Sequence, residues 1–328
     1  MIDSFICFSK KILDFYGVLT EATYVIIVIK KELKLIILFL LVITIIFSGK
    51  KLFTEDPVYS ERFLPAKNTG EINDLRLEEA SGMVASRSIP GLFWVINDSG
   101  NGPLLFLIDK NGQIRMSYLI DGFDNIDWED LAIYTDKTTG NSQIYIADIG
   151  DNFAFRSHIN IILIDEPKDI NRNDSILYHA KNYCFRYEDG PRDAETLLVD
   201  PITKGIYIIT KREENVRIYE APKILNSADT MNLAFKQRLP FFNITSGDIS
   251  QDGTEILLKT YDAIFYWKNS NNESLVDALS KDHELLNYIP EPQGESIAWS
   301  VENNGFYTLS ERNNPLSQNL YFYKRNRQ

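Results

Sequence analysis

Cysteine is almost absent from this 328-residue sequence, which contains only Cys7 and Cys184. Cys7 lies in the N-terminal tail, so the body of the protein can form neither an internal disulfide nor a cysteine-based zinc site. Histidine is nearly as rare, and the three histidines (His158, His179 and His283) have no metal-ligand spacing. These absences exclude a disulfide-rich scaffold and give no sign of a zinc centre.

Several enzyme motifs and any excess of positive charge are also missing. The chain has no Gly-x-Ser-x-Gly elbow, no His-Glu-x-x-His motif and no phosphate-binding glycine loop. Its net charge is −12, and because residues 1–52 carry +3, the remainder carries −15. Proteins that bind nucleic acid need a basic stripe to neutralise phosphates, so we expect no nucleic-acid partner.

A long uncharged apolar run occurs near the N-terminus, at residues 35–47, and lysines flank it on both sides. Five lysines precede the run and two follow it closely, a bias that keeps the N-terminus in the cytoplasm. Lys50 stands where a lipoprotein signal would need cysteine. We predict a leader (1–29), a signal-anchor or transmembrane helix (30–52), a linker (53–60) and a propeller body (61–328) on the periplasmic or outer-surface side. A buried core helix is the alternative for the run.

The body contains an internal repeat, in which a polar pair precedes a short apolar strand. Five copies start 48, 66, 52 and 48 residues apart, at Ser81, Glu129, Glu195, Gly247 and Glu295. A second and a third strand follow each start, and a looser fourth is present in most units, for example at 178–187. This pattern predicts an all-β fold, a β-propeller of five four-stranded blades in which residues 61–78 complete the last blade. Six blades and a β-sandwich are the alternatives.

In a propeller, the loop entering each inner strand and the loop between the second and third strands open on the same face. Polar residues at these two places should therefore converge at one channel mouth. The acidic and amide residues that we expect there are Asp98, Glu129, Asp130, Asp148, Asp151, Asn152, Glu195, Asp248, Glu295 and Glu311, with the cations Lys211, Arg212 and Lys259. Tyr261, at the end of a second strand, can also face the mouth.

Two kinds of role fit such a set of carboxylates. Ca²⁺ takes about six to eight oxygen ligands from Asp, Glu, Asn and backbone carbonyls, so Ca²⁺ is the expected cofactor. Crowded carboxylates also raise one another's pKa values, as a general base requires. The alternative is structural, because Asp and Asn cap tight turns and pair with cations between blades.

Eight segments occur in one order over roughly residues 78–311: SGMVAS, VINDSGN, DWEDLAIY, YIADIGDN, DAETLLVD, YIITKR, SGDIS and GESIAW. In these motifs the sequence resembles a widespread family of uncharacterised bacterial exported or lipid-anchored propeller proteins. More distantly it is similar to the calcium-dependent propeller hydrolases, which are phytase-like, lactonase-like or gluconolactonase-like and often six-bladed. That resemblance implies acidic and Asn ligands for calcium around a central channel.

Three hypotheses for function follow. The first is a membrane-anchored, extracytoplasmic propeller that binds a divalent cation or a small ligand at an acidic site on one channel mouth. The second is a calcium-dependent esterase or phosphoesterase that uses the same carboxylates. The third is a propeller for protein interaction without a ligand site. They leave open whether the protein is an enzyme. We expect a monomer whose N-terminal helix contacts the membrane and whose ligand is a small molecule or a protein.

Overall fold

The computed structural model describes residues 33–34, 39, 57–168, 176–270, 273–313 and 315–326. The chain divides into two compact units, Met1–Pro57 and Val58–Gln328. The predicted leader (1–29) and most of the predicted anchor (30–52) lie outside the described residues; Leu33, Lys34 and Phe39 are helical. Within the described ranges, no helix has the length and apolar character that crossing a bilayer requires.

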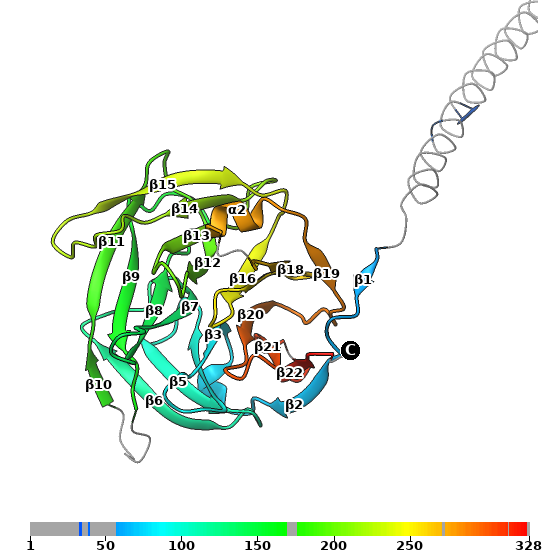
Figure 1. The fold of residues 1–328 in the computed structure, drawn as a ribbon, viewed down its shortest axis with the longest axis horizontal. Helices are drawn as coiled ribbons and strands as arrows, with labels where there is room; N and C mark the ends of the chain where they lie inside the picture. The colour runs from blue at the N-terminus through cyan, green and yellow to red at the C-terminus, as the bar shows by residue number, and fades with distance from the viewer. Residues whose placement is uncertain are drawn as a thin grey trace, which may run out of the picture. The chain divides into compact units, whose positions relative to one another are not determined.

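The unit Val58–Gln328 consists mainly of antiparallel strands arranged in four sheets (Figure 1). In order across the first sheet, the strands are β3 (Ala80–Ala85), β4 (Leu92–Asn97), β5 (Leu104–Asp109), β6 (Ile114–Asp121) and β10 (Ile176–His179). Those of the second are β7 (Trp128–Thr135), β8 (Ser142–Asp148), β9 (Ile159–Asp165), β11 (Lys181–Tyr187), β15 (Met231–Arg238), β14 (Arg217–Glu220), β13 (Ile206–Thr210) and β12 (Ala194–Val199).

The remaining two sheets contain both ends of the unit. The third sheet has the order β16 (Ile244–Ile249), β17 (Glu255–Thr260), β18 (Ile264–Lys268), β19 (Glu284–Leu286) and β1 (Tyr59–Ser60). The fourth has the order β20 (Gly294–Trp299), β21 (Gly305–Ser310), β22 (Asn319–Lys324) and β2 (Lys67–Glu71). Two short helices, η1 (Leu75–Leu77) and α2 (Leu275–Leu279), lie in the connections.

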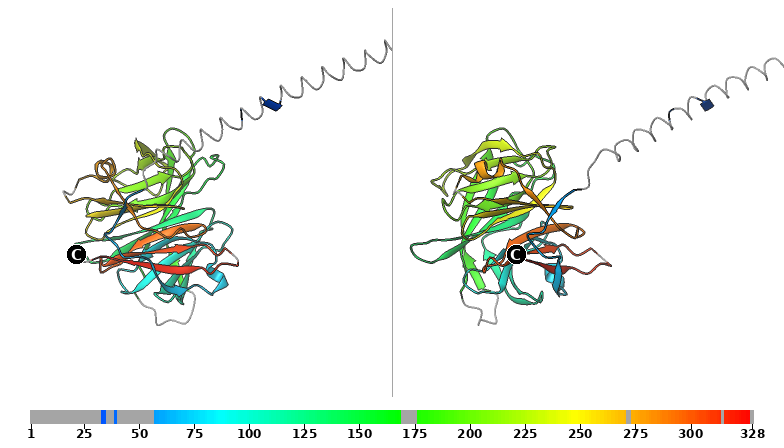
Figure 2. Two further views of the ribbon diagram at one scale, coloured as in Figure 1. Left: turned by 90° about the vertical axis from the view of Figure 1, so that its right-hand side faces the viewer. Right: turned by 45° about the vertical axis from the view of Figure 1, so that its right-hand side comes forward.

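The strands β3, β7, β12, β16 and β20 form a closed ring, because each contacts the next and β20 contacts β3. Sheets arranged side by side around such a ring make a β-propeller, as Figure 1 shows, and Figure 2 gives two further views of the same sheets. As the repeat predicted, a strand that precedes the first unit completes the last one: β2 pairs antiparallel with β22. This pairing joins the two ends of the body through backbone hydrogen bonds.

Burial differs between the inner and the outer strands. Every residue of β3, β12 and β20 is buried, because neighbouring sheets cover both faces of an inner strand. Sequences covered on both faces read as continuous apolar runs rather than as alternating patterns. The outer strand β6 instead alternates between buried and less buried residues. The inner strands therefore lie in the interior of the propeller, whereas β6 has one face toward solvent.

The segment 178–187, predicted as one strand, forms parts of two strands. β10 ends at His179 and pairs parallel with β6 of the first sheet, whereas β11 begins at Lys181 and pairs antiparallel with β9. β11 also pairs parallel with β15, so two four-stranded units join at their outer edges into the eight-stranded sheet (Figure 1). Its first and last strands, β7 and β12, contact each other, and the sheet therefore wraps almost completely around one hydrophobic core.

Candidate functional site

Three glutamates stand at the same place in three inner strands. Glu129, Glu195 and Glu295 are the second residues of β7, β12 and β20. Each strand has a register shift at its second residue, which marks a β-bulge against the neighbouring strand. Bulges re-aim side chains and are common beside functional sites. The three bulges therefore place three carboxylates at one end of the ring of inner strands.

The fourth repeat has a different register from the one that the sequence predicted. The prediction aligned Gly247-Asp248 with the starts of the other inner strands, but β16 begins at Ile244, and its second residue is Thr245. Asp248 is the fifth residue of β16 and accepts hydrogen bonds from Trp299 N (2.7 Å) and Ile249 N (2.8 Å). Trp299 is the last residue of β20, so Asp248 lies toward the opposite end of the channel from Glu295.

Carboxylates from the adjacent loops lie close to two of the glutamates at the β-bulges. Oxygen atoms of Asp98, Asp127 and Glu129 all lie within 4.8 Å of one another, and so do oxygen atoms of Asp98, Glu295 and Glu311. Asp98 follows β4 and Glu311 follows β21, and both were predicted at this mouth. Because Asp98 belongs to both groups, the five side chains form one cluster, which we call the acidic mouth.

Asp127 is the member of the acidic mouth that the sequence did not single out as a site residue. It lies directly before β7, in the same acidic stretch as Glu129. Its backbone N–H donates to Asp148 Oδ1 at 3.1 Å, and its carbonyl accepts from Gly150 N at 3.2 Å. Its position in the loop that enters an inner strand, directly before Trp128 and Glu129, is the feature of the sequence that indicates this place.

One lysine partly neutralises the edge of the acidic mouth. Lys211 Nζ pairs with Glu195, lies 3.7 Å from Glu295 Oε1 and donates to Tyr261 Oη at 2.9 Å. Tyr261 Oη in turn donates to Glu295 Oε1 at 2.6 Å. Burial acts to lower the pKa of Lys211, but the charges of Glu195 and Glu295 raise it, so the ammonium stays charged.

Other carboxylate oxygens at the mouth have no such partner. Glu195 Oε2 and Glu295 Oε2 are buried and accept no hydrogen bond from the described residues. In the same part of the chain, the ion pairs near the mouth involve Glu195, Glu295, Asp148 and Asp193, but none involves Asp98, Asp127, Glu129 or Glu311. Buried acceptors without donors are unfavourable unless a cation or a proton occupies the space between them.

The electrostatic environment favours protonated carboxyls when no cation is bound. Burial, followed by the charges of neighbouring carboxylates, raises the pKa of Glu129 well above its usual value. Burial raises the pKa of Asp98 to about 6, and burial together with the adjacent Glu295 raises the pKa of Glu311 to about 9. A cation entering the mouth would therefore compete with protons.

Gly150 allows the carboxylates to approach the backbone of the loop after β8. A Cβ atom at this position would lie 2.5 Å from Asp127 Cγ and closer still to Glu129 Oε1. Only glycine leaves room for both carboxylates here, which gives a physical reason for the glycine in the Asp-Ile-Gly-Asp-Asn segment.

Asp130 lies next to Glu129 in sequence but has a different environment. Its carboxylate accepts hydrogen bonds from Leu197 N (3.0 Å), Leu131 N (2.9 Å) and Ser246 Oγ (3.3 Å). It therefore connects β7 to β12 and β16 inside the ring, and its burial raises its pKa. These contacts are structural.

Four further predicted residues form hydrogen bonds and ion pairs in the loop between β8 and β9 and in the loop that follows β13. Asp148 pairs with Arg156 at 3.0 Å and accepts from Asn160 Nδ2 at 3.1 Å. Asp151 accepts from the backbone N–H groups of residues 155 and 156. Asn152 accepts from Arg212, whose guanidinium also pairs with Asp193. These contacts place all four residues beside the acidic mouth, where they stabilise the loops that carry it.

Lys259, predicted as a cation at the mouth, is fully buried between β17 and β20. Its Nζ donates to Thr260 O at 3.0 Å and to Gly294 O, and it lies 4.9 Å from the centre of the Tyr288 ring. Burial lowers its pKa to about 8, although the charges of Glu291 and Glu295 oppose this effect. Lys259 therefore stabilises the contact between two sheets.

Two exposed phenyl rings stand on the loop that carries Gly150. Phe153 and Phe155 are 82% and 73% exposed, and their rings stack with centroids 6.0 Å apart. Ile126, directly before Asp127, is also exposed. Large apolar side chains therefore occur at the rim of the acidic mouth.

Comparisons with known proteins add a likeness of fold. No family model and no curated protein matches this sequence. Among solved structures, a luciferin-regenerating enzyme is similar over 79% of this chain and 95% of its own, with 10% sequence identity and a TM-score of 0.44. A likeness this distant carries no information about ligand or activity. Membership of the bacterial exported propeller family stays a prediction.

Proposed function

We propose that this protein is a five-bladed propeller that binds a divalent cation at the acidic mouth. The five inner strands in their closed ring support the blade count. The main support for the cation site is that Asp98 belongs to two groups of carboxylates, and within each group the oxygens lie within 4.8 Å of one another. Glu195 Oε2 and Glu295 Oε2, which are buried and have no hydrogen-bond partner in the described part of the chain, add further acceptors beside it.

Calcium fits this set of donors better than zinc or magnesium does. The five carboxylates of the acidic mouth offer only oxygen, whereas structural zinc sites use mainly sulfur and nitrogen. Ca²⁺ accepts about six to eight oxygens in variable geometry and tolerates bidentate carboxylates. Mg²⁺ prefers strict octahedral geometry and retains water, so we expect it to bind more weakly.

Calorimetric titration and thermal unfolding of the full-length protein test the proposal. A cation present at 100 times its Kd stabilises the folded state by about 2.7 kcal/mol. We expect Ca²⁺ to raise Tm relative to EDTA, and Glu129→Gln and Asp98→Asn to abolish the rise. The matched control is Glu302→Gln, which changes an exposed glutamate in the turn between β20 and β21. If no divalent ion shifts Tm, the carboxylates hold protons and serve packing, and a protein partner becomes the better hypothesis.

Hydrolysis of an ester or phosphoester with calcium is the second candidate. One observation favours it over simple binding. The stacked rings of Phe153 and Phe155 beside the acidic mouth offer a platform for an apolar substrate group. Turnover of p-nitrophenyl esters or phosphates that requires Ca²⁺ and is lost in Asp98→Asn supports this reading. Calcium binding without turnover of either class contradicts it.

We also propose that residues 30–52 anchor a monomeric propeller on the extracytoplasmic side of the membrane. The support is the uncharged run at 35–47 and the lysine bias around it. An alkaline phosphatase reporter fused after residue 60 and expressed in bacteria should be active, because this enzyme matures only outside the cytoplasm. An inactive, cytoplasmic fusion contradicts the orientation.

A further inference from the structure

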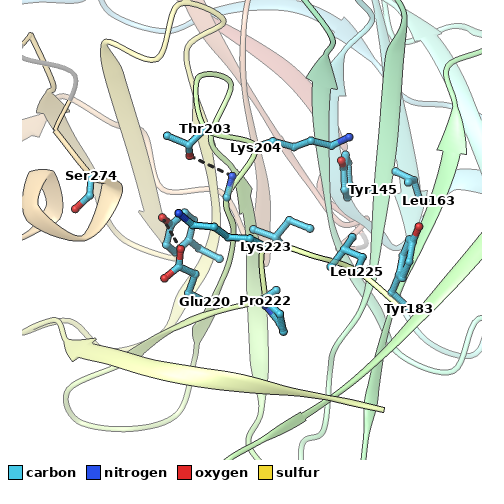
Figure 3. A pocket seen from close by; sticks show the side chains of 14 residues that line it. Tyr145, Leu163, Tyr183, Thr203, Lys204, Glu220, Pro222, Lys223, Leu225 and Ser274 are labelled. Carbon is cyan, nitrogen blue, oxygen red and sulfur yellow. Dashed lines mark hydrogen bonds between the residues drawn. The ribbon is translucent and has the colours of Figure 1, made fainter. Parts of the chain in front are cut away.

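A second candidate site lies at the other end of the strands from the acidic mouth. A cavity of about 570 Å³ opens where the eight-stranded sheet ends, beside the turn between β12 and β13 (Figure 3). Its walls come from both joined units, with Tyr145, Leu163 and Tyr183 on one side and Glu220 and Lys223 on the other. Small-molecule pockets usually measure about 300–1,000 Å³ and often occupy the mouths of barrel-like sheets.

Tyr145 marks the polar end of this cavity. The side chain is completely buried, and within the described part of the chain its hydroxyl has no hydrogen-bond partner. Tyr183 stands next to it on the same wall (Figure 3). Buried hydroxyls normally have a partner, so an unpaired one that lines a cavity points to a ligand acceptor atom.

Charge at the cavity favours an anion. Lys204 and Lys223 line it, and neither forms an ion pair with a carboxylate of the described residues. The carboxylate that lines it, Glu220, is already neutralised: Lys236 Nζ lies 2.9 Å from Glu220 Oε2, and Tyr207 Oη donates to Glu220 Oε1 at 3.3 Å. Lys204 Nζ donates to the neutral Gln143 Oε1 at 3.3 Å and lies 5.0 Å from the centre of the Tyr134 ring. Among the described residues, no ion pair therefore balances the positive charge of Lys204 or of Lys223.

The rest of the lining is apolar. Leu163, Ile206, Pro222 and Leu225 contribute aliphatic surface. Leu225 and Tyr183 are only partly buried and pack against the hydrophobic core that the eight strands enclose. An occupant with an apolar body would extend that core and remove more apolar surface from water.

We propose that this cavity binds a small organic carboxylate with an apolar body. The carboxylate accepts a hydrogen bond from Tyr145 Oη, and Lys204 and Lys223 attract it at the opening. The apolar body packs against Leu163 and Leu225. This site is independent of the acidic mouth, which lies at the opposite ends of the same strands.

Three ten-carbon probes test the proposal on the full-length protein: decanoate, decanol and decylamine. Each competes with the fluorescent anion 8-anilinonaphthalene-1-sulfonate, and we expect decanoate to displace it most strongly. Tyr145→Phe should weaken the binding of decanoate by about tenfold, because the protein loses a hydrogen bond to a charged group. Leu225→Trp, which fills the cavity, should abolish binding.

Tyr187→Phe is the matched control. Tyr187 belongs to the same core and its buried hydroxyl also lacks a described partner, but it does not line the cavity. It should leave decanoate binding unchanged, as should Glu129→Gln, which separates this site from the acidic mouth. Equal displacement by all three probes, unchanged affinity in Tyr145→Phe or Leu225→Trp, or no binding of decanoate overturns the proposal.

Discussion

Replacing Gly150 by alanine tests whether the carboxylates of the acidic mouth act together. Gly150 does not have a left-handed backbone, so alanine can adopt its conformation, and the effect comes from the added methyl group. That methyl would lie 2.5 Å from Asp127 Cγ, whereas carbon atoms in contact stay about 3.5 Å apart. The carboxylates of Asp127 and Glu129 must therefore move by roughly 1 Å.

A displacement of this size matters because cation–ligand distances tolerate only about 0.2 Å. We expect Gly150→Ala to weaken Ca²⁺ binding by about 10–100-fold, or roughly 1.4–2.8 kcal/mol, as for other changes that misplace metal ligands. Crowding should also reduce the free energy of unfolding by about 1–3 kcal/mol. Calorimetric titration gives the affinity, and urea unfolding in EDTA gives the stability.

The control for this change is Gly102→Ala, in the loop between β4 and β5 on the same face. A Cβ atom there meets only Leu104 Cγ, at 3.9 Å, and the backbone is not left-handed. We expect it to leave both Kd and stability unchanged. The reasoning is refuted if Gly150→Ala binds Ca²⁺ as tightly as the unchanged protein does while Glu129→Gln does not bind.

Three further predictions concern charge and support at the same end of the ring. Without divalent cations, stability should fall as pH rises from about 4.5 to 9, because Glu311, with a folded-state pKa of about 9, keeps in the folded state a proton that the unfolded chain releases near pH 4.5. Urea unfolding at several pH values checks this, and Glu311→Gln should flatten the profile; a profile that rises with pH contradicts it. Lys211→Met should reduce the free energy of unfolding by about 3–5 kcal/mol, since it leaves the buried Glu195 and Glu295 without their cation. Thermal unfolding should show that Ca²⁺ restores part of this stability. An equal loss of stability with and without Ca²⁺ argues against a shared site. Asp130→Ala should reduce the free energy of unfolding by about 1–3 kcal/mol, because Leu197 N–H and Ser246 Oγ–H lose their acceptor. Calorimetry should nevertheless show an unchanged Kd for Ca²⁺. A large change in that Kd would make Asp130 part of the site.

The second strands of the propeller could be predicted because several of them, such as β4 and β13, are short apolar runs bounded by turn residues. The predicted second strand at 92–97, for example, coincides with β4 (Leu92–Asn97). Pairing between distant strands was harder to predict. The segment 178–187 looks like one strand locally, but its halves pair with different sheets, because β6 and β9 both have an edge free.

The register of the fourth unit shows why a local pattern can mislead. Gly247-Asp248 resembles the polar pairs of the other units, but Thr245-Ser246 occupies the equivalent place in β16. Asp248 directly precedes the apolar Ile249, whereas Ser246 precedes Gly247 and Asp248. The local pattern therefore favours the wrong pair. Pairing with Thr260 of β17 decides the start of the strand, and that contact is visible only in the folded chain.

By itself, the sequence determined the repeated four-stranded unit, the lack of disulfides and the face on which acidic residues gather. These features depend on local patterns of polarity and on the fixed direction of successive strands. Only the tertiary structure decided which carboxylates meet, because that depends on bulges in three strands and on the space left by Gly150. It also decided that β11 pairs with β15, and hence that a cavity opens at the end of the joined sheet, where the hydroxyl of Tyr145 has no partner among the described residues. Such features arise from contacts between residues far apart in the chain, which no local pattern encodes.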